Sequence, residues 1–168
     1  MDTILLRSSP DLVVRWPNGG GFQQIEMRVN GEPLIDLVRQ YELPYVRQEW
    51  DERTAGEESE ADLGPRDSLA GRYLYLPPSI VYPPSRNFFG AVYDHGFCTE
   101  PDDPSNNKSL ILQCTCGITD CWFLLATIAV DEDHVTWSNF QQFHRDWSYD
   151  GLKFTFDRRQ YNEAFVPA

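Results

Sequence analysis

Three cysteines within eight residues form the strongest chemical signal in the sequence. Cys114, Cys116 and Cys121 follow the spacing C-x-C-G-x3-C, with Gly117 directly after the second cysteine. Zinc in proteins takes tetrahedral thiolate and imidazole ligands, and short cysteine loops supply them. A glycine at this point lets the backbone turn with positive φ and aim amide donors at the sulfurs. The spacing therefore predicts three local ligands of a zinc ion.

A fourth ligand must come from another part of the chain. We favour His144, because the segment 143–145 reads as irregular and can fold back onto the cysteine turn. Cys98 is the second candidate, and His134 and His95 are the remaining ones. Four protein ligands leave no open position for water, so the expected zinc ion has a structural role.

Two other interpretations of the cysteines stay open. A cysteine beside Trp122 and Phe123 can be an ordinary buried thiol of the core. Alternatively, Cys121 and His144 could form a nucleophile pair in a thiol-dependent enzyme or a redox sensor. A reactive thiolate needs a nearby cation, whereas the sequence neighbourhood supplies mainly Asp120. A disulfide between the first two cysteines would close a very small strained ring. No G-x-S-x-G, H-E-x-x-H, Walker or dinucleotide motif occurs, which favours a non-enzymatic protein and leaves the thiol-dependent enzyme as the alternative.

The elements around the cysteines indicate an α+β fold. Strands are expected at 4–6, 12–16, 22–29, 73–76, 88–92, 110–113, 121–130, 134–137 and 153–156. The stretch 121–130 is apolar on both faces and should lie in the centre of a sheet. Prolines bracket an extended segment over 77–84. Asp157 and Gln160 predict the capped start of a C-terminal helix. The order of elements favours one domain over residues 1–168 with a mainly antiparallel sheet.

A mid-chain helix and an acidic stretch follow the first strands. Leu34, Leu37, Val38 and Tyr41 have the spacing of one buried helix face, which predicts a helix over 34–42 that Pro44 ends. From residue 48 to 71, acidic residues outnumber basic ones and apolar residues are sparse. This composition predicts a mobile acidic loop, either a solvated surface or the contact surface for a basic partner.

Composition excludes several classes of function. The chain has 168 residues and a formal charge of −12, and its 14 Lys and Arg are scattered, which argues against a nucleic-acid partner. The longest apolar run, 121–130, is too short to cross a membrane. The first residues lack the basic and apolar regions of a secretory signal, so a cytoplasmic location is expected. An acidic protein of this kind suits a basic protein partner.

An aromatic segment, Trp137–Tyr149, lies near the end of the chain and contains Arg145. Aromatic residues with arginine anchor many protein interfaces. In a small domain, however, most tryptophans pack at least partly inside. We therefore expect this segment to pack mainly against the sheet.

The motifs C-x-C-G-x3-C-W, V-x-W-x2-F, H-R-x-W-x-Y and F-D-R-x2-Y occur between Cys114 and Tyr161. This pattern resembles that of small uncharacterised bacterial proteins, with a weaker similarity over Val29–Val38. The resemblance implies no activity. In its small, acidic character the chain is also similar to immunity proteins that neutralise toxins. The resulting expectation is a non-enzymatic protein that binds a basic partner.

Overall fold

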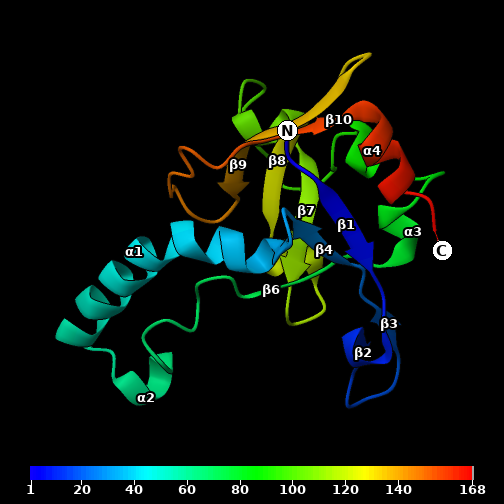
Figure 1. Cartoon of the computed structure of the whole chain (residues 1–168). Helices are drawn as coiled ribbons and strands as arrows, with labels where there is room; N and C mark the ends of the chain where they lie inside the picture. Colours follow the sequence, from blue (N-terminus) through cyan, green and yellow to red (C-terminus); the bar gives the residue numbers. More distant parts are fainter. Residues whose placement is uncertain (168) are drawn as a thin grey trace.

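The computed structural model describes residues 1–167, and a five-stranded antiparallel sheet lies at its centre (Figure 1). The strands are ordered β10-β9-β8-β7-β6. Their bounds are β6 (Tyr73–Leu74), β7 (Ser109–Cys114), β8 (Leu124–Val130), β9 (His134–Gln142) and β10 (Phe154–Asp157). Antiparallel sheets with separate helices confirm the expected α+β class.

The middle strand, β8, confirms the prediction that the apolar run lies centrally. It begins at Leu124, because residues 119–121 form a 3₁₀ turn before it. It pairs antiparallel with β7 on one side and β9 on the other. Every residue of β7 is buried, so this strand also contributes both faces to the core.

The N-terminal strands form two smaller sheets against the main one. The first consists of β1 (Ile4–Arg7), β4 (Glu26–Val29) and β5 (Glu32–Pro33), and the second of β2 (Val13–Arg15) and β3 (Gly21–Gln23). The single strand predicted over 22–29 was wrong, because the chain changes partner at Gln24 and Ile25. The Gln24 amide donates to Leu12, whereas the Ile25 amide donates to Leu76.

The mid-chain helix α1 (Leu34–Ala55) is much longer than predicted and continues through Pro44. A proline inside a helix removes one backbone hydrogen bond but does not forbid the helix. Here Glu42 and Val46 are both buried, so packing on either side of Pro44 outweighs the lost bond. The predicted end at Pro44 was therefore wrong.

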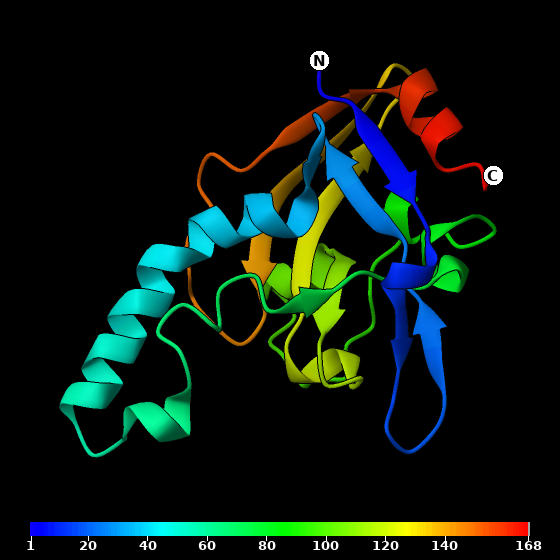
Figure 2. The ribbon, with the colours of Figure 1, turned by 60° about the horizontal axis from the view of Figure 1, so that its bottom comes forward.

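The acidic stretch 48–71 contains more helix than the predicted loop. Its first residues belong to α1, and α2 (Glu60–Leu63) follows after a turn. The Ser59 hydroxyl accepts from the Asp62 amide and caps α2. In Figures 1 and 2, the outer part of α1 and α2 project away from the sheet. The mobility of this stretch stays a prediction.

Two short segments before β7 differ from the extended chain that was expected. Residues Pro78–Val81 form the one-turn helix α3, with proline at its first position, where no amide is needed. The strand predicted over 88–92 was wrong: Asn87–Phe89 is a 3₁₀ turn. The Asn87 side chain donates to the Leu110 carbonyl and accepts from the Leu110 amide. At Leu110 of β7, the Asn87 side-chain amide thus makes the backbone hydrogen bonds that a neighbouring strand would otherwise make.

The C-terminal helix α4 (Arg158–Ala164) is capped by Asp157, whose carboxylate accepts from the Gln160 amide at 3.0 Å. The Gln160 side chain pairs with the backbone of Ile4 instead of returning to the cap. Tyr161 is fully buried in the core, and its hydroxyl accepts from the Trp137 indole. Of the residues the structure describes, none lies in a helix long and apolar enough to cross a membrane.

Candidate functional site

The cysteine turn, residues 114–121 (hereafter the thiol turn), joins β7 to β8 and brings the predicted cysteines together. Cys114 ends β7 opposite Tyr73 of β6 and is buried, whereas Cys116 and Cys121 are exposed. The Cys114 thiol donates to the sulfur of Cys116 across 3.2 Å. The Cys116 amide donates to the Cys114 sulfur at 3.4 Å. Gly117 has a φ of 91°, which confirms the predicted positive φ at this position.

The cysteines differ in acidity because their surroundings differ. The pKa of Cys116 is lowered, first by a backbone hydrogen bond at Ile118 and then by the Cys114 side chain. The hydrogen bond to Cys116 and partial desolvation raise the pKa of Cys121. Burial raises the pKa of Cys114. Cys116 is therefore the member of the cluster that forms a thiolate first.

His144 lies next to the thiol turn but not at its sulfurs. As expected, its segment folds back, and its Nε2 lies 2.7 Å from the carbonyl oxygen of Asp120. The imidazole ring packs edge-on against Phe97, Phe123 and Phe143. Because Nε2 is occupied in this hydrogen bond, that nitrogen is not free to bind a metal ion in this arrangement.

The other predicted donors lie in unrelated surroundings. Cys98 is exposed, His95 is buried between Ser105 and Phe143, and His134 lies beside Asp131. Within residues 1–167, no three or more Cys, His, Asp or Glu side chains are placed to hold a metal ion. The 3.2 Å between the first two sulfurs is shorter than the ~3.8 Å between two thiolates on one tetrahedral zinc ion. Zinc binding by Cys114, Cys116, Cys121 and His144 thus stays a prediction.

A hollow of about 330 Å³ opens beside the sulfurs. It is lined by Leu69, Arg72, Cys114, Thr115, Cys116, Cys121 and Trp122. Arg72 is exposed, and in the part of the chain that the structure describes its guanidinium has no hydrogen bond or ion pair. Arg72, from the segment before β6, is the basic residue in the lining of this hollow.

The β2–β3 hairpin covers the other side of the thiol turn. Figures 1 and 2 both place the turn between this hairpin and the projecting helix. A second hollow of about 430 Å³ lies there, lined by Trp16, Pro17, Asn18, Cys116, Gly117 and Ile118. A Cβ atom on Gly117 would lie 3.0 Å from the Trp16 ring, so the indole packs closely on this glycine. Cys116 lines both hollows.

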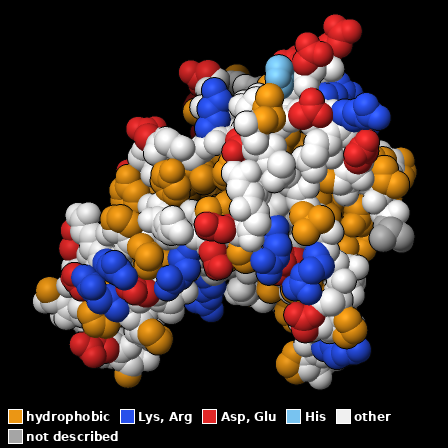
Figure 3. Space-filling view, viewed as in Figure 1, with side chains coloured by type: hydrophobic (Ala, Val, Ile, Leu, Met, Phe, Trp, Pro, Cys, Tyr) orange, Lys and Arg blue, Asp and Glu red, His pale blue; other side chains and the backbone are white. Residues whose placement is uncertain are grey.

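The projecting arm, defined as residues 47–72, is fastened by arginine–carboxylate pairs. These are Arg47–Asp67, Arg53–Glu58, Arg66–Asp51 and Arg145–Glu49. In the first three, the arginine is the main reason that the pKa of its carboxylic acid partner is lowered. Basic and acidic side chains accordingly mix over the arm in Figure 3.

The tip of the arm, residues 52–62, carries acidic side chains that no arginine neutralises. Among residues 1–167, the following form no ion pair with Lys or Arg: Glu52, Glu57, Glu60 and Asp62. All of them are exposed. The tip is thus a negative surface held away from the body of the protein.

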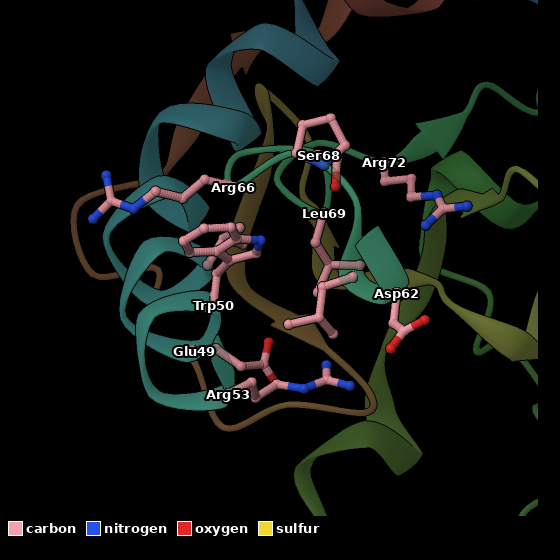
Figure 4. A pocket seen from close by; sticks show the side chains of 11 residues that line it. Glu49, Trp50, Arg53, Asp62, Arg66, Ser68, Leu69 and Arg72 are labelled. Carbon is pink, nitrogen blue, oxygen red and sulfur yellow. The ribbon is translucent and has the colours of Figure 1, made fainter. Parts of the chain in front are cut away.

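A small cavity of about 170 Å³ separates α1 from the returning chain of the arm. Trp50 and Leu69 point into it from opposite walls, and Arg66 and Arg72 lie on different sides (Figure 4). The Trp50 indole donates to the Gly64 carbonyl at 3.0 Å, which ties the chain after α2 to α1. Leu69 and Arg72 line both this cavity and the thiol hollow.

The aromatic segment 137–149 packs mainly against the sheet, as expected. Trp137, Phe140 and Tyr149 are buried. Trp147 is half-buried and stacks on Tyr45 of α1, with ring centroids 6.0 Å apart. This segment therefore supports the base of the arm.

The residue that sequence reasoning missed is Arg72. It is far from the cysteines in sequence, and only the pairing of Tyr73 with Cys114 brings it to the hollow. No local spacing signals this neighbour; a correct pairing of the two strands would have found it.

Comparisons with known proteins identify no relative of this chain. No model of a protein family matches the chain, and neither a curated protein nor a solved structure is significantly similar to it.

Proposed function

We propose that the protein binds a basic protein partner through the tip of its acidic arm, without catalysing a reaction. The observation that carries this proposal is the group of unpaired, exposed carboxylates on an element that projects from the body. A net charge of −12 adds long-range attraction for a cationic partner. A protein that masks a basic enzyme, as immunity proteins do, would use such a surface.

The ion pairs of the arm separate two roles of its charges. The carboxylates of Asp51, Glu58 and Asp67 already have arginine partners and hold the arm together. Those of Glu57 and Glu60 are free to meet a partner's Lys or Arg side chains. Exposed charged side chains at a binding surface mainly set the rate and the specificity of association.

The shape of the arm also suits a binding role. A long helix that leaves the sheet exposes its outer turns on several sides, and α1 has no buried residue beyond Val46. Such a surface contributes little to the stability of the fold itself. Its exposed outer turns are instead available for contact with a second protein.

Charge-matched variants test the proposal. In the arm variant, Glu52→Gln, Glu57→Gln, Glu60→Gln and Asp62→Asn remove the carboxylates of the tip. In the control variant, Glu100→Gln, Asp102→Asn, Glu132→Gln and Asp133→Asn remove as many exposed carboxylates elsewhere. Both variants have the same net charge, so a difference between them reports position.

The probe is a labelled lysine-rich peptide, and the measurement is its dissociation constant at low and at high salt. We expect the arm variant to bind about tenfold more weakly at low salt than the control variant. High salt should remove the difference. Equal weakening in both variants would show that only the overall charge attracts the peptide, and it would overturn the proposal.

A further inference from the structure

The thiol turn has the features of a reactive site that the binding proposal does not use. Cys116 is exposed, and its sulfur is 3.2 Å from that of Cys114. Its side chain lines hollows on both sides of the turn, so a small molecule can approach the sulfur. The Cys116 sulfur is therefore exposed to small molecules and at the same time hydrogen-bonded to the Cys114 thiol.

The hollow beside the sulfurs offers a complementary lining for a small anion with an apolar part. The Arg72 guanidinium has no partner among the described side chains, and a guanidinium binds a carboxylate through two parallel hydrogen bonds. Leu69 and Trp122 form an apolar wall next to it. The volume of about 330 Å³ lies in the range of small-molecule sites.

We propose that the thiol turn undergoes thiol–disulfide exchange with disulfides of small, carboxylate-bearing thiols. In the first step the Cys116 thiolate attacks one sulfur of the small disulfide. A new bond forms from Cys116 to that sulfur, the original S–S bond breaks, and the second small thiol leaves as a thiolate that takes up a proton. The carboxylate of the attached thiol pairs with Arg72.

In the second step Cys121 resolves this mixed disulfide. Its thiol loses a proton to solvent and attacks the sulfur of Cys116, which expels the remaining small thiol. Two protein thiols are thereby oxidised, and one small disulfide is reduced to two thiols. Cys121 is exposed and five residues from Cys116, so this ring is larger than the very small ring that Cys114 would close.

The test uses oxidised glutathione as the disulfide and intact-protein mass spectrometry as the readout. Wild type should first gain one glutathione and then lose it together with two hydrogens. Cys121→Ser should stop at the glutathione adduct, and Cys116→Ser should form neither product. Cys98→Ser is the matched control, since Cys98 is also exposed but lies outside the cluster; it should behave as wild type.

A second comparison isolates the role of Arg72. Arg72→Gln should slow adduct formation with oxidised glutathione about tenfold but leave the rate with an uncharged disulfide, hydroxyethyl disulfide, unchanged. Equal slowing with both disulfides would overturn the assignment of the carboxylate to Arg72.

Three results would overturn the exchange site itself. One is that Cys98 reacts as fast as Cys116. Another is that wild type forms no adduct at all. The third is one equivalent of zinc in protein purified without chelator, with the cluster cysteines unreactive until the metal is removed.

Discussion

The body and the arm of this protein are held together by different forces. The body contains a sheet whose core is filled by large apolar side chains, among them Trp137, Phe88 and Phe156. The arm has few buried residues and depends on exposed arginine–carboxylate pairs. Burial gives a stability that salt hardly changes, whereas exposed ion pairs weaken with salt. The comparison indicates that the body sets the stability and that changes in the arm, where we propose binding, cost the fold little.

Glu42 joins the two regions at the point where α1 leaves the sheet. Its carboxylate is fully buried and accepts hydrogen bonds from the hydroxyls of Tyr73 and Tyr149 and from the Gly71 amide. Burial is the main reason that its pKa is raised, and the three donors oppose that effect. One acidic side chain therefore links the helix, the end of the arm and the aromatic segment.

The largest effect is expected in the body. Trp137→Ala removes a fully buried indole and should lower the free energy of unfolding by about 3–5 kcal/mol. Trp147→Ala, at the base of the arm, removes a half-buried ring and should cost about 1–2 kcal/mol. Denaturant unfolding measures both. Equal losses would show that the contact at the base of the arm stabilises the fold as much as the core does, which would contradict this comparison.

The next largest loss of stability is expected at Glu42, where α1 leaves the sheet. Glu42→Ala leaves two buried tyrosine hydroxyls without their acceptor and should lower the free energy of unfolding by about 3 kcal/mol. Glu42→Gln keeps an acceptor and the shape of the side chain, so it should cost clearly less. If both substitutions lower the free energy of unfolding equally, the hydrogen bonds to Glu42 do not stabilise the fold.

The raised pKa of Glu42 predicts a pH dependence with a definite sign. Its contribution to stability is fully present below the ordinary pKa of 4.5 and is lost as the pH rises through the raised value. The stability of wild type relative to Glu42→Gln should therefore fall as the pH rises above about 4.5. Chemical denaturation of both proteins over a pH series measures this difference. A difference that grows with pH would show that the carboxylate is stabilised, not penalised, by the fold.

The smallest effect on stability, but a clear one on local order, is expected in the arm. Arg66→Gln removes the pair with Asp51, and global unfolding should not differ measurably from wild type. Limited proteolysis within residues 56–64 should become several-fold faster, and salt should accelerate it in wild type too. Arg159→Gln, which removes an exposed pair on α4, is the control and should leave arm cleavage unchanged.

The sequence predicted the body better than the arm. The apolar run that became β8 and the cap at Asp157 are local signals, and both were interpreted correctly. The length of α1 was not predictable locally, because burial of Glu42 and Val46 outweighs the effect of Pro44. Likewise, the strand predicted over 88–92 is replaced by a 3₁₀ turn at Asn87–Phe89, where the Asn87 side chain pairs with the backbone of Leu110, a residue distant in the sequence.

The candidate sites, too, could be predicted only where their residues lie close together in the sequence. The cysteines and Gly117 were visible in the sequence, since their spacing is short. Arg72 was not, because it reaches them through the pairing of two strands distant in the chain. The acidic residues of the arm were also visible, but the sequence could not say which of them arginines neutralise and which stay free.

Hydrogen–deuterium exchange with and without the lysine-rich peptide tests the central claim most directly, namely that the arm is the binding element and the body its support. The account predicts slower exchange within residues 47–72, which is absent in the arm variant, present in the control variant and lost at high salt. The strands β7, β8 and β9 should exchange at the same rate with and without peptide. Protection confined to the body, or protection that persists in the arm variant, would contradict the account.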